Sequence, residues 1–266
     1  MQTESESEDY VEQRRQWTQE QNRLKGQLLL HDDFPWKLSP PLSDPHQPLC
    51  LVGGVDLSFC KHDLTVGCGA LVVLNINTMN VIYEDFAVTH LRMPYIPGFL
   101  AFRESPVLLA LLEKLSRKHV DMYPQVLMVD GNGILHPRGF GLASHLGVLA
   151  NIPTIGVAKN LYHVDGLCRQ DLRMGHDITD ASTPLVGNSG QVLGMALRSH
   201  PDCTKPIFVS VGHRISLGTA VSVVQKCCKY RIPEPVRQAD IRSRKQIKVT
   251  SAVPSIRVTF DEHASP

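Results

Sequence analysis

The sequence has few of the features that mark a secreted, zinc-binding or membrane-embedded protein. Its seven cysteines are odd in number and form no CxxC pair, which argues against a disulfide scaffold or a zinc site. The first nine residues are polar and acidic, so we expect no secretory signal. No apolar run approaches the roughly 20 residues of a membrane span. We therefore expect a reducing compartment, the cytoplasm and/or the nucleus with the nucleolus as one option, and no membrane partner.

The sequence also lacks an excess of either charge, because 27 Lys and Arg face 26 Asp and Glu. The distribution is uneven. Residues 226–248 hold eight basic and two acidic side chains, a local charge of +6 that leaves −5 for the rest of the total of +1. Two interpretations stay open for this span: a surface that contacts phosphates, or a solvated helical face.

The length of 266 residues suits one large domain or two small ones. We expect residues 1–14 to be a disordered acidic N-terminus, residues 15–250 to form a single domain, and residues 251–266 to be a flexible tail. A polar helix is expected over 11–30, followed by a proline-rich connection over 34–48.

Three strands, 51–56, 66–76 and 81–88, are joined by short turns and predict an antiparallel meander. A helix over 106–118 follows, with Ser105 as N-cap and Pro106 in the first turn. The remaining pattern predicts strands at 125–129, 154–158, 191–197 and 206–211, and helices at 141–150 and 215–230. This is the pattern of a ribonuclease H-like α/β fold, a mixed sheet of antiparallel meander plus parallel strands flanked by helices.

Three acidic residues stand at predicted element boundaries: Asp56 and Asp130 each end an apolar strand, and Glu104 stands where a helix begins. A carboxylate at the mouth of a buried strand is unfavourable unless its charge is compensated. Mg²⁺ is a common compensating ion because it prefers oxygen ligands. In the predicted fold, Asp56 and Asp130 lie on adjacent strands within reach of one metal. The alternatives are a turn or N-cap role for the aspartates, and a first-turn glutamate that complements the helix dipole.

Several segments resemble the motifs of the endonuclease V family, in the order and at the spacing of that family. They are 52–59 (VGGVDLSF), 94–104 (PYIPGFLAFRE), 129–133 (VDGNG), 156–159 (GVAK), 212–217 (GHRISL) and 232–240 (IPEPVRQAD). The resemblance extends over about residues 15–248 and is greatest to the animal members.

The resemblance implies a metal-dependent endoribonuclease that recognises inosine in single-stranded RNA. It would hydrolyse the second phosphodiester bond on the 3′ side, leaving 3′-hydroxyl and 5′-phosphate ends. Mg²⁺ is the implied cofactor, with Mn²⁺ as a substitute, and we expect a monomer. Two alternatives stay open: a repair endonuclease that acts on deoxyinosine in DNA, and an inosine-RNA binding protein without catalysis.

The resemblance also implies a catalytic set of Asp56, Glu104, Asp130, Lys159 and Asp240, in which the four acids hold the metal. Asp240 is replaced by His in some family members, and it has the alternative of a helix-surface aspartate paired with Arg237 or Arg244. Lys159 would position the attacking water or neutralise phosphate charge. Its alternative is a solvated residue at a strand end.

Substrate contacts are expected from loops around the acids. Two prolines in 94–97 restrict the backbone and would hold an exposed tyrosine as a wedge beside the extruded base; a loop closing on the core is the alternative. The backbone N–H groups of Gly131 and Gly133 would suit the O6 and N7 acceptors of the base. The complete set of expected substrate-binding residues is Pro94, Tyr95, Ile96, Pro97, Leu100, Gly131, Asn132, Gly133, His136, Leu142 and His213. For Leu100 and Leu142 the alternative is core packing, and for the two histidines it is a turn, cap or packing role.

Overall fold

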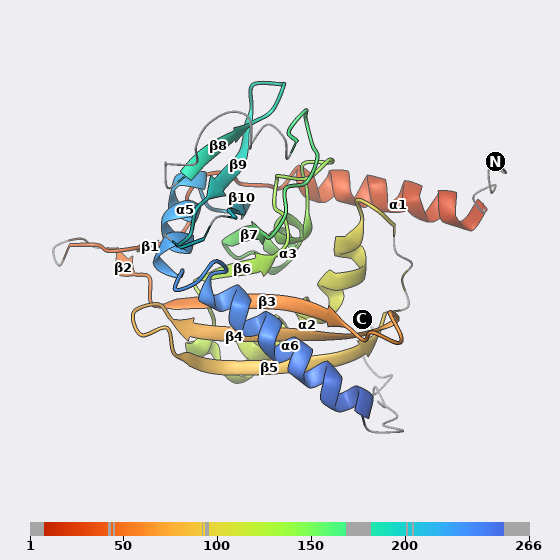
Figure 1. The fold of residues 1–266 in the computed structure, drawn as a ribbon, viewed down its shortest axis with the longest axis horizontal. Coiled ribbons are helices and arrows are strands. Elements are labelled where there is room, and N and C mark those ends of the chain that lie inside the picture. The colour runs from red at the N-terminus through yellow and green to blue at the C-terminus, as the bar shows by residue number, and fades with distance from the viewer. Residues whose placement is uncertain are drawn as a thin grey trace.

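The computed structural model describes residues 8–41, 44, 46–91, 93, 96–168, 182–200, 202–203 and 205–252. It contains one eight-stranded mixed sheet with helices on both faces (Figure 1). This confirms the predicted mixed α/β fold. Within the described part of the chain, no helix combines the length and the apolar character needed to cross a membrane.

The sheet has the strand order β5-β4-β3-β6-β7-β10-β9-β8. Strands β3, β4 and β5 form the predicted antiparallel meander, β3 pairs in parallel with β6, and β6 pairs in parallel with β7. Strands β10, β9 and β8 extend the sheet with antiparallel pairs. The bounds are β3 Leu51–Phe59, β4 Val66–Asn75, β5 Val81–His90, β6 Val126–Asp130, β7 Thr154–Ala158, β8 Ser182–Val186, β9 Val192–Leu197 and β10 Ile207–His213.

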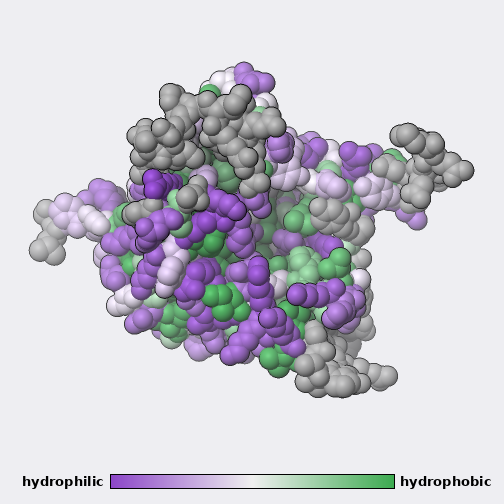
Figure 2. Space-filling model, viewed as in Figure 1, coloured by the Kyte–Doolittle hydropathy of each residue, from purple (hydrophilic) through white to green (hydrophobic). Residues whose placement is uncertain are grey.

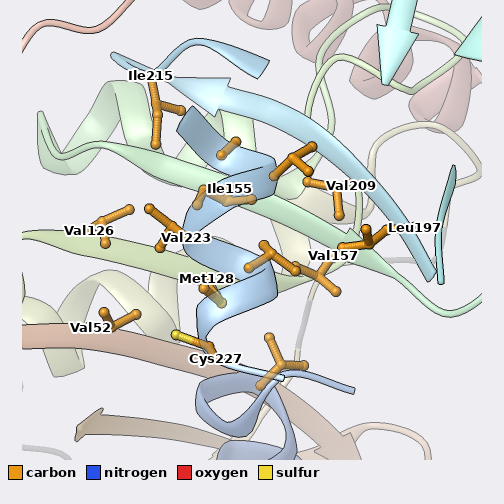
Figure 3. Packing of buried hydrophobic residues seen from close by; sticks show 14 of the residues in the cluster. Val52, Val126, Met128, Ile155, Val157, Leu197, Val209, Ile215, Val223 and Cys227 are labelled. Carbon is orange, nitrogen blue, oxygen red and sulfur yellow. The ribbon is translucent and has the colours of Figure 1, made fainter. Parts of the chain in front are cut away.

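Alternate side chains along the strands point to opposite faces of the sheet, and each face has its own hydrophobic core. In β6, Val126 and Met128 belong to one buried cluster, and Leu127 and Val129 to the other, as expected for a strand covered on both faces. Helices α5 (Leu217–Lys226) and α6 (Glu234–Ala252) cover the first face, and α2 (Leu100–Lys118) and α3 (Leu142–Ala150) cover the second. Figure 3 shows Val223 of α5 lying over the sheet among the residues of the first cluster.

Helix α6 packs unusually closely on β3. A side chain at Gly54 would place its Cβ 2.1 Å from the carbonyl oxygen of Pro235, so only glycine permits this approach. The sequence pattern had not delimited α6 as an element. It carries much of the basic span of 226–248, and hydrophilic residues dominate the surface over it (Figure 2).

Several predicted boundaries are wrong. Helix α2 begins at Leu100, so Pro106 lies inside it and Ser105 is not its N-cap; the early start is stabilised by Phe102, whose ring stacks on Trp17 at 5.0 Å. Helix α1 (Glu8–Lys25) includes residues 8–14, which were expected to be disordered, and the ion pair of Arg15 with Glu12 at 2.7 Å supports that end.

Further differences concern short or extended elements. Strand β3 continues to Phe59 instead of ending at position 56, and α5 ends at Lys226 instead of near position 230. The proline-rich connection contains two paired two-residue strands, β1 (Trp36–Lys37) and β2 (Gln47–Pro48). Neither these nor β8 were predicted, and a short 3₁₀ helix over Val120–Met122 follows α2.

Candidate active site

Strand register brings Asp56 and Asp130 together. Strands β3 and β6 are parallel and in register, with Val55 opposite Val129, so the next residue of each strand is one of the two aspartates. Helix α6 supplies Asp240 from above the same face. One carboxylate oxygen of each aspartate lies within 4.8 Å of one oxygen of the other two. The predicted adjacency of Asp56 and Asp130 is therefore present, and Asp240 joins them.

Glu104 approaches from α2, which covers the opposite face of the sheet. It lies in the second turn of the helix, not at its start, so a first-turn interaction with the helix dipole does not account for it. The side chain is buried, and burial together with the charges of Asp56 and Asp130 raises its pKa to about 8 although Arg103 opposes the shift. Glu104 lies outside the group of three aspartates whose oxygens are within 4.8 Å of one another, and its link to Asp56 and Asp130 is through charge. The three aspartates and Glu104 are together called the acid cluster below.

Two serines that the sequence analysis missed hold Asp56. The hydroxyl of Ser243 donates to Asp56 Oδ2 at 2.7 Å, and that of Ser58 donates to the same oxygen at 3.2 Å. The two hydroxyls also lie 2.7 Å apart, and both serines are buried. Spacing was an available signal, because Ser58 is two residues from Asp56 on a strand and Ser243 is three residues from Asp240 on a helix.

Lys159 follows β7 directly and faces the acid cluster. Its Nζ lies 2.5 Å from Asp130 Oδ2 and 3.6 Å from Asp240 Oδ1. Burial by itself would lower the pKa of Lys159, but the charges of Asp130, Asp240 and Asp56 outweigh burial and raise it. Asp240 also pairs with Arg244 at 2.8 Å, so the predicted helix-surface ion pair and the place in the cluster are both present.

The charges and donor atoms of the cluster fit a divalent cation. Among the described residues, Lys159 and Arg244 form ion pairs with Asp130 and Asp240, and the charge of Arg103 acts on Glu104, so four carboxylates face three cations. Burial, assisted by the charges of Asp130 and Asp240, raises the pKa of Asp56 to about 6 even though Ser243 favours its charged form. The carboxylate of Asp56 is buried and those of Asp130 and Asp240 are partly buried, and clustered carboxylate oxygens are the ligands that Mg²⁺ and Mn²⁺ bind.

A small cavity of about 130 Å³ adjoins the cluster on the side of α2 and α3. Its walls are the 96–99 loop and the 131–141 loop together with the first turns of α2 and α3. Neither helix is capped by a side chain of its N-cap residue. The lining residues are Ile96, Pro97, Gly98, Leu100, Ala101, Glu104, Asp130, Gly131, Asn132, His136, Phe140, Gly141, Leu142 and Tyr162.

Seven of the expected substrate-binding residues line this cavity, and Pro94 and Tyr95 lie outside the described residues. The site residues predicted from the sequence did not include Gly98, Ala101, Phe140, Gly141 and Tyr162, which also line the cavity. Tyr162 belongs to none of the matching motifs, so it is identified only by the tertiary structure, which places it in the cavity wall with its ring centroid 5.9 Å from that of His136.

The expectation that the Gly131 and Gly133 N–H groups are open to a base is wrong for this structure. The Gly131 N–H donates to the carbonyl of Val157 at 3.2 Å, and the Gly133 N–H donates to the Ser210 hydroxyl at 2.9 Å. Both bonds hold the loop on the sheet. Gly131, at φ +150°, still lines the cavity, whereas Gly133 is packed against β10.

The two histidines have different environments. His136 lines the cavity, and its Nδ1 accepts the N–H of Arg138 at 3.2 Å. Burial and the charges of Arg138 and Lys25 lower the pKa of His136 to about 4. It is therefore neutral near pH 7, with its proton on Nε2, because Nδ1 acts as an acceptor.

The structure does not bring His213 together with the other predicted substrate residues, because it lines neither the small cavity nor the acid cluster. It ends β10 and pairs with Thr154 at the start of β7. Lys159 follows the other end of β7, roughly 16 Å away at the rise of an extended strand. The His213 side chain is buried, and its Nδ1 accepts the Leu29 N–H at 3.3 Å. The packing alternative describes it correctly.

An open groove of about 760 Å³ adjoins the cluster on the side of α6. Asp130 lines both the groove and the small cavity, so the acid cluster lies between them. Lys61, Arg244 and Lys248 stand around the groove, and Phe59 and Ile247 add apolar surface.

The basic span of residues 226–248 was predicted to be either a phosphate-contacting surface or a solvated helical face, and different residues of it fit each interpretation. Arg244 and Lys248 line the groove. Arg237 pairs with Glu234 at 2.8 Å and Arg242 with Glu84 at 2.5 Å, while Arg231 donates to backbone carbonyls. Only part of the span is therefore placed to meet a charged ligand.

Known proteins share this sequence and this architecture. A family model described as endonuclease V matches residues 37–241. The endonuclease V of Homo sapiens is 49% identical over 243 residues, which cover 90% of this chain and 84% of that protein. The endonuclease V of Mus musculus is 51% identical over 238 residues, 88% of this chain and 69% of that protein.

Solved structures of endonuclease V proteins are also similar to this chain. A crystal structure of human endonuclease V superposes with a TM-score of 0.81 at 48% identity, covering 89% of this chain and 98% of the other. Ciona intestinalis endonuclease V, in complex with a 24-mer DNA containing an inosine followed by a ribo-adenosine, gives a TM-score of 0.80 at 36% identity. That match covers 90% of this chain and 99% of the other.

Proposed function

This chain belongs to the endonuclease V family, nucleases that hydrolyse phosphodiester bonds, and on that premise we propose that it is an inosine-specific endoribonuclease. It would act on single-stranded RNA and cut the second phosphodiester bond 3′ to the inosine. The products would carry 3′-hydroxyl and 5′-phosphate ends. We propose Mg²⁺ as its cofactor, with Mn²⁺ able to substitute, and a monomer as the active form.

One observation carries the proposal: the acid cluster lies between a small cavity and an open groove. The cavity of about 130 Å³ is far below the roughly 300–1,000 Å³ of sites that enclose whole small molecules. It suits a single extruded base. The groove is open along one side and carries basic residues, which suits the backbone that continues from that base.

The walls of the cavity favour a base that presents an acceptor. The proton on Nε2 makes neutral His136 a donor, and the first turns of α2 and α3 present the positive ends of their dipoles. Hypoxanthine has a carbonyl at C6, whereas adenine has an amino group there. A carbonyl oxygen is stabilised by such surroundings, and an amino group is not.

The chain's own residues then arrange the reaction. Asp56, Glu104, Asp130 and Asp240 would hold the metal, with Ser58 and Ser243 orienting Asp56. A bound divalent cation supplies water activation and stabilisation of the leaving oxygen. The ammonium of Lys159, which lies at the same carboxylates, is placed to offset phosphate charge and orient the attacking water.

RNA is the favoured substrate for two reasons. The chain is about half identical to mammalian relatives, and the motifs resemble those of animal members. The Ciona relative was crystallised with a strand in which a ribonucleotide follows the inosine. That position lies between the base and the proposed cut, where a 2′-hydroxyl would be sensed.

The test uses a labelled single-stranded RNA with one inosine, a matched strand with adenosine, and a matched DNA with deoxyinosine, all in Mg²⁺. We expect a single cut one nucleotide 3′ to inosine in the RNA, and none with adenosine or with the Asp130→Ala variant. Faster cutting of the DNA strand would establish the repair alternative instead. Inosine-dependent binding without cutting would establish a reader, and neither binding nor cutting would overturn the proposal.

A further inference from the structure

Helix α1 braces the small cavity although it precedes the segment matched by the family model, residues 37–241. Gln21 of this helix is almost completely buried. Its Nε2 donates to the carbonyl of Phe140 at 2.9 Å and to that of Gly98 at 3.3 Å. Arg138 Nε donates to the remaining oxygen, Gln21 Oε1. One side chain thus satisfies all of its hydrogen-bonding groups on the two loops that wall the cavity.

Aromatic contacts fix the same helix to the 96–99 loop. Trp17, one helical turn before Gln21, packs in a buried cluster with Ile96 and Phe99. The guanidinium of Arg138 lies over the ring of Phe99, 5.0 Å from its centroid. Trp17, Gln21 and the buried Leu24 share one face of α1, and the N-terminal end of the helix projects beyond the sheet (Figure 1).

We propose that Gln21 is a positioning residue for the inosine base, because it sets the separation of the 96–99 and 131–141 loops across the small cavity. This inference rests on the proposed function of that cavity. Gly98 and Phe140 both line the cavity and both accept from the same Nε2 atom. Their distance from one another is therefore fixed by the amide of Gln21.

The physical reason is the cost of leaving buried groups unsatisfied. Without the Gln21 amide, the buried carbonyl of Phe140 loses a donor and Arg138 loses its acceptor. Each group regains a partner only by moving toward water, which separates the walls. A wider cavity contacts a flat base on one side only, so both affinity and discrimination decline.

The test compares Gln21→Met, which keeps the length of the side chain but none of its polar links, with wild type on the single-inosine RNA. We expect KM for inosine RNA to rise at least about tenfold and the preference for inosine over adenosine to fall. The rate at saturating RNA and the Mg²⁺ concentration for half-maximal rate should change by less than about threefold. A raised KM with an unchanged saturating rate and Mg²⁺ requirement indicates a defect in base positioning, whereas damage to the acid cluster would change the rate or the Mg²⁺ requirement.

A second measurement makes the result specific to the base. Binding to an RNA with an abasic site in place of inosine, measured in Ca²⁺, should be the same for wild type and Gln21→Met. Leu24→Ala, buried on the same helix face, controls for loss of stability, and Gln16→Ala, exposed and bonded to Glu12, controls for any change in α1. Neither control should alter the preference for inosine.

The outcomes distinguish the two proposals. If wild type does not cut inosine RNA, the proposed function fails. If wild type cuts but a folded Gln21→Met variant keeps its KM and its preference for inosine, the positioning role is wrong. Equal weakening on inosine and abasic strands would also overturn it.

Discussion

The acid cluster and the small cavity are neighbouring halves of one site, but they are held in different ways. The aspartates project from two paired strands of the sheet and from a helix packed directly on it. The cavity is walled by two loops whose separation depends on contacts with α1. Strand pairing leaves the aspartates little freedom, whereas a loop wall moves with whatever braces it. Changes in the two halves should therefore impair different steps.

The largest effect is expected from Asp56→Asn, which alters the acid cluster and leaves the small cavity intact, since Asp56 does not line that cavity. Loss of several kcal/mol of transition-state stabilisation corresponds to about a thousandfold slower cleavage. Binding of inosine RNA should be unchanged. Single-turnover cleavage and a binding titration measure the two effects.

The same variant has a stability consequence that serves as its control. Because burial and repulsion from Asp130 and Asp240 disfavour the charged form of Asp56, the amide should raise Tm in the absence of metal. A thousandfold loss of binding together with cleavage would contradict the separation of the two halves.

A smaller effect is expected from Leu100→Trp, which fills the small cavity. Leu100 lines the cavity and is 38% exposed, so the larger ring can be accommodated without disturbing the core. Affinity for inosine RNA should fall about a hundredfold, while the Mg²⁺ dependence of cleavage stays unchanged. Leu100→Ala, which leaves the cavity open, is the matched control. A shifted Mg²⁺ requirement would show that the halves are coupled.

The pH dependence of stability tests the acid cluster without involving the small cavity. The pKa of Asp56 is raised from 3.8 to about 6, and that of Glu104 from 4.5 to about 8. The folded protein therefore keeps protons that the unfolded chain has released. Without divalent cations, these two groups lower the free energy of unfolding as pH rises from about 4 to about 8. Added Mg²⁺ should restore stability most at the upper end of this range.

Thermal unfolding at about pH 5 and about pH 8, with Mg²⁺ and with a chelator, measures this effect. Glu104→Gln removes the group with the larger shift and should flatten the profile. An increase in Tm with Mg²⁺ that is the same at both pH values would count against metal binding by these carboxylates.

Ser243→Ala should have a moderate effect. The hydroxyl orients Asp56 through a bond of 2.7 Å, and loss of such a supporting contact typically weakens metal binding by about tenfold. The Mg²⁺ concentration for half-maximal cleavage should rise accordingly, with little change in affinity for inosine RNA. Ser222→Ala, an exposed serine of α5 that bonds to the Gly218 carbonyl, is the control. An unchanged Mg²⁺ requirement would show that Ser58 suffices.

The smallest effect on catalysis is expected from His213→Gln. His213 lies at the end of β7 opposite to Lys159 and accepts the Leu29 N–H. Loss of that packing should reduce the free energy of unfolding by about 1 kcal/mol and leave cleavage unchanged. Denaturant unfolding and cleavage assays measure both. A tenfold slower cleavage by folded protein would restore a substrate role to this histidine.

Much of the sheet was predictable because the apolar pattern of each strand matches its burial between two layers of helices. Alternating or continuous apolar runs predicted strands β3 to β7. They also predicted that β3, β4 and β5 form a meander and that β3 lies beside β6, which brings the two aspartates to one edge of the sheet. Boundaries failed where distant contacts intervene. The stacking of Phe102 on Trp17 supports the start of α2 before Pro106, and no local signal in that segment reports it.

The sequence by itself determined the residue types of the acid cluster and, through strand alternation, the face on which Asp56 and Asp130 lie. Tertiary structure alone decided that Ser243 of α6 meets Asp56 of β3, which N–H groups of the 131–133 segment are already engaged, and that Gln21 joins the two cavity walls. The physical reason is the separation in sequence of the residues that interact. Alternation along a strand follows from the backbone of neighbouring residues, whereas hydrogen bonds between distant residues, 77 positions apart for Gly133 and Ser210 and 187 for Asp56 and Ser243, exist only once the chain has packed.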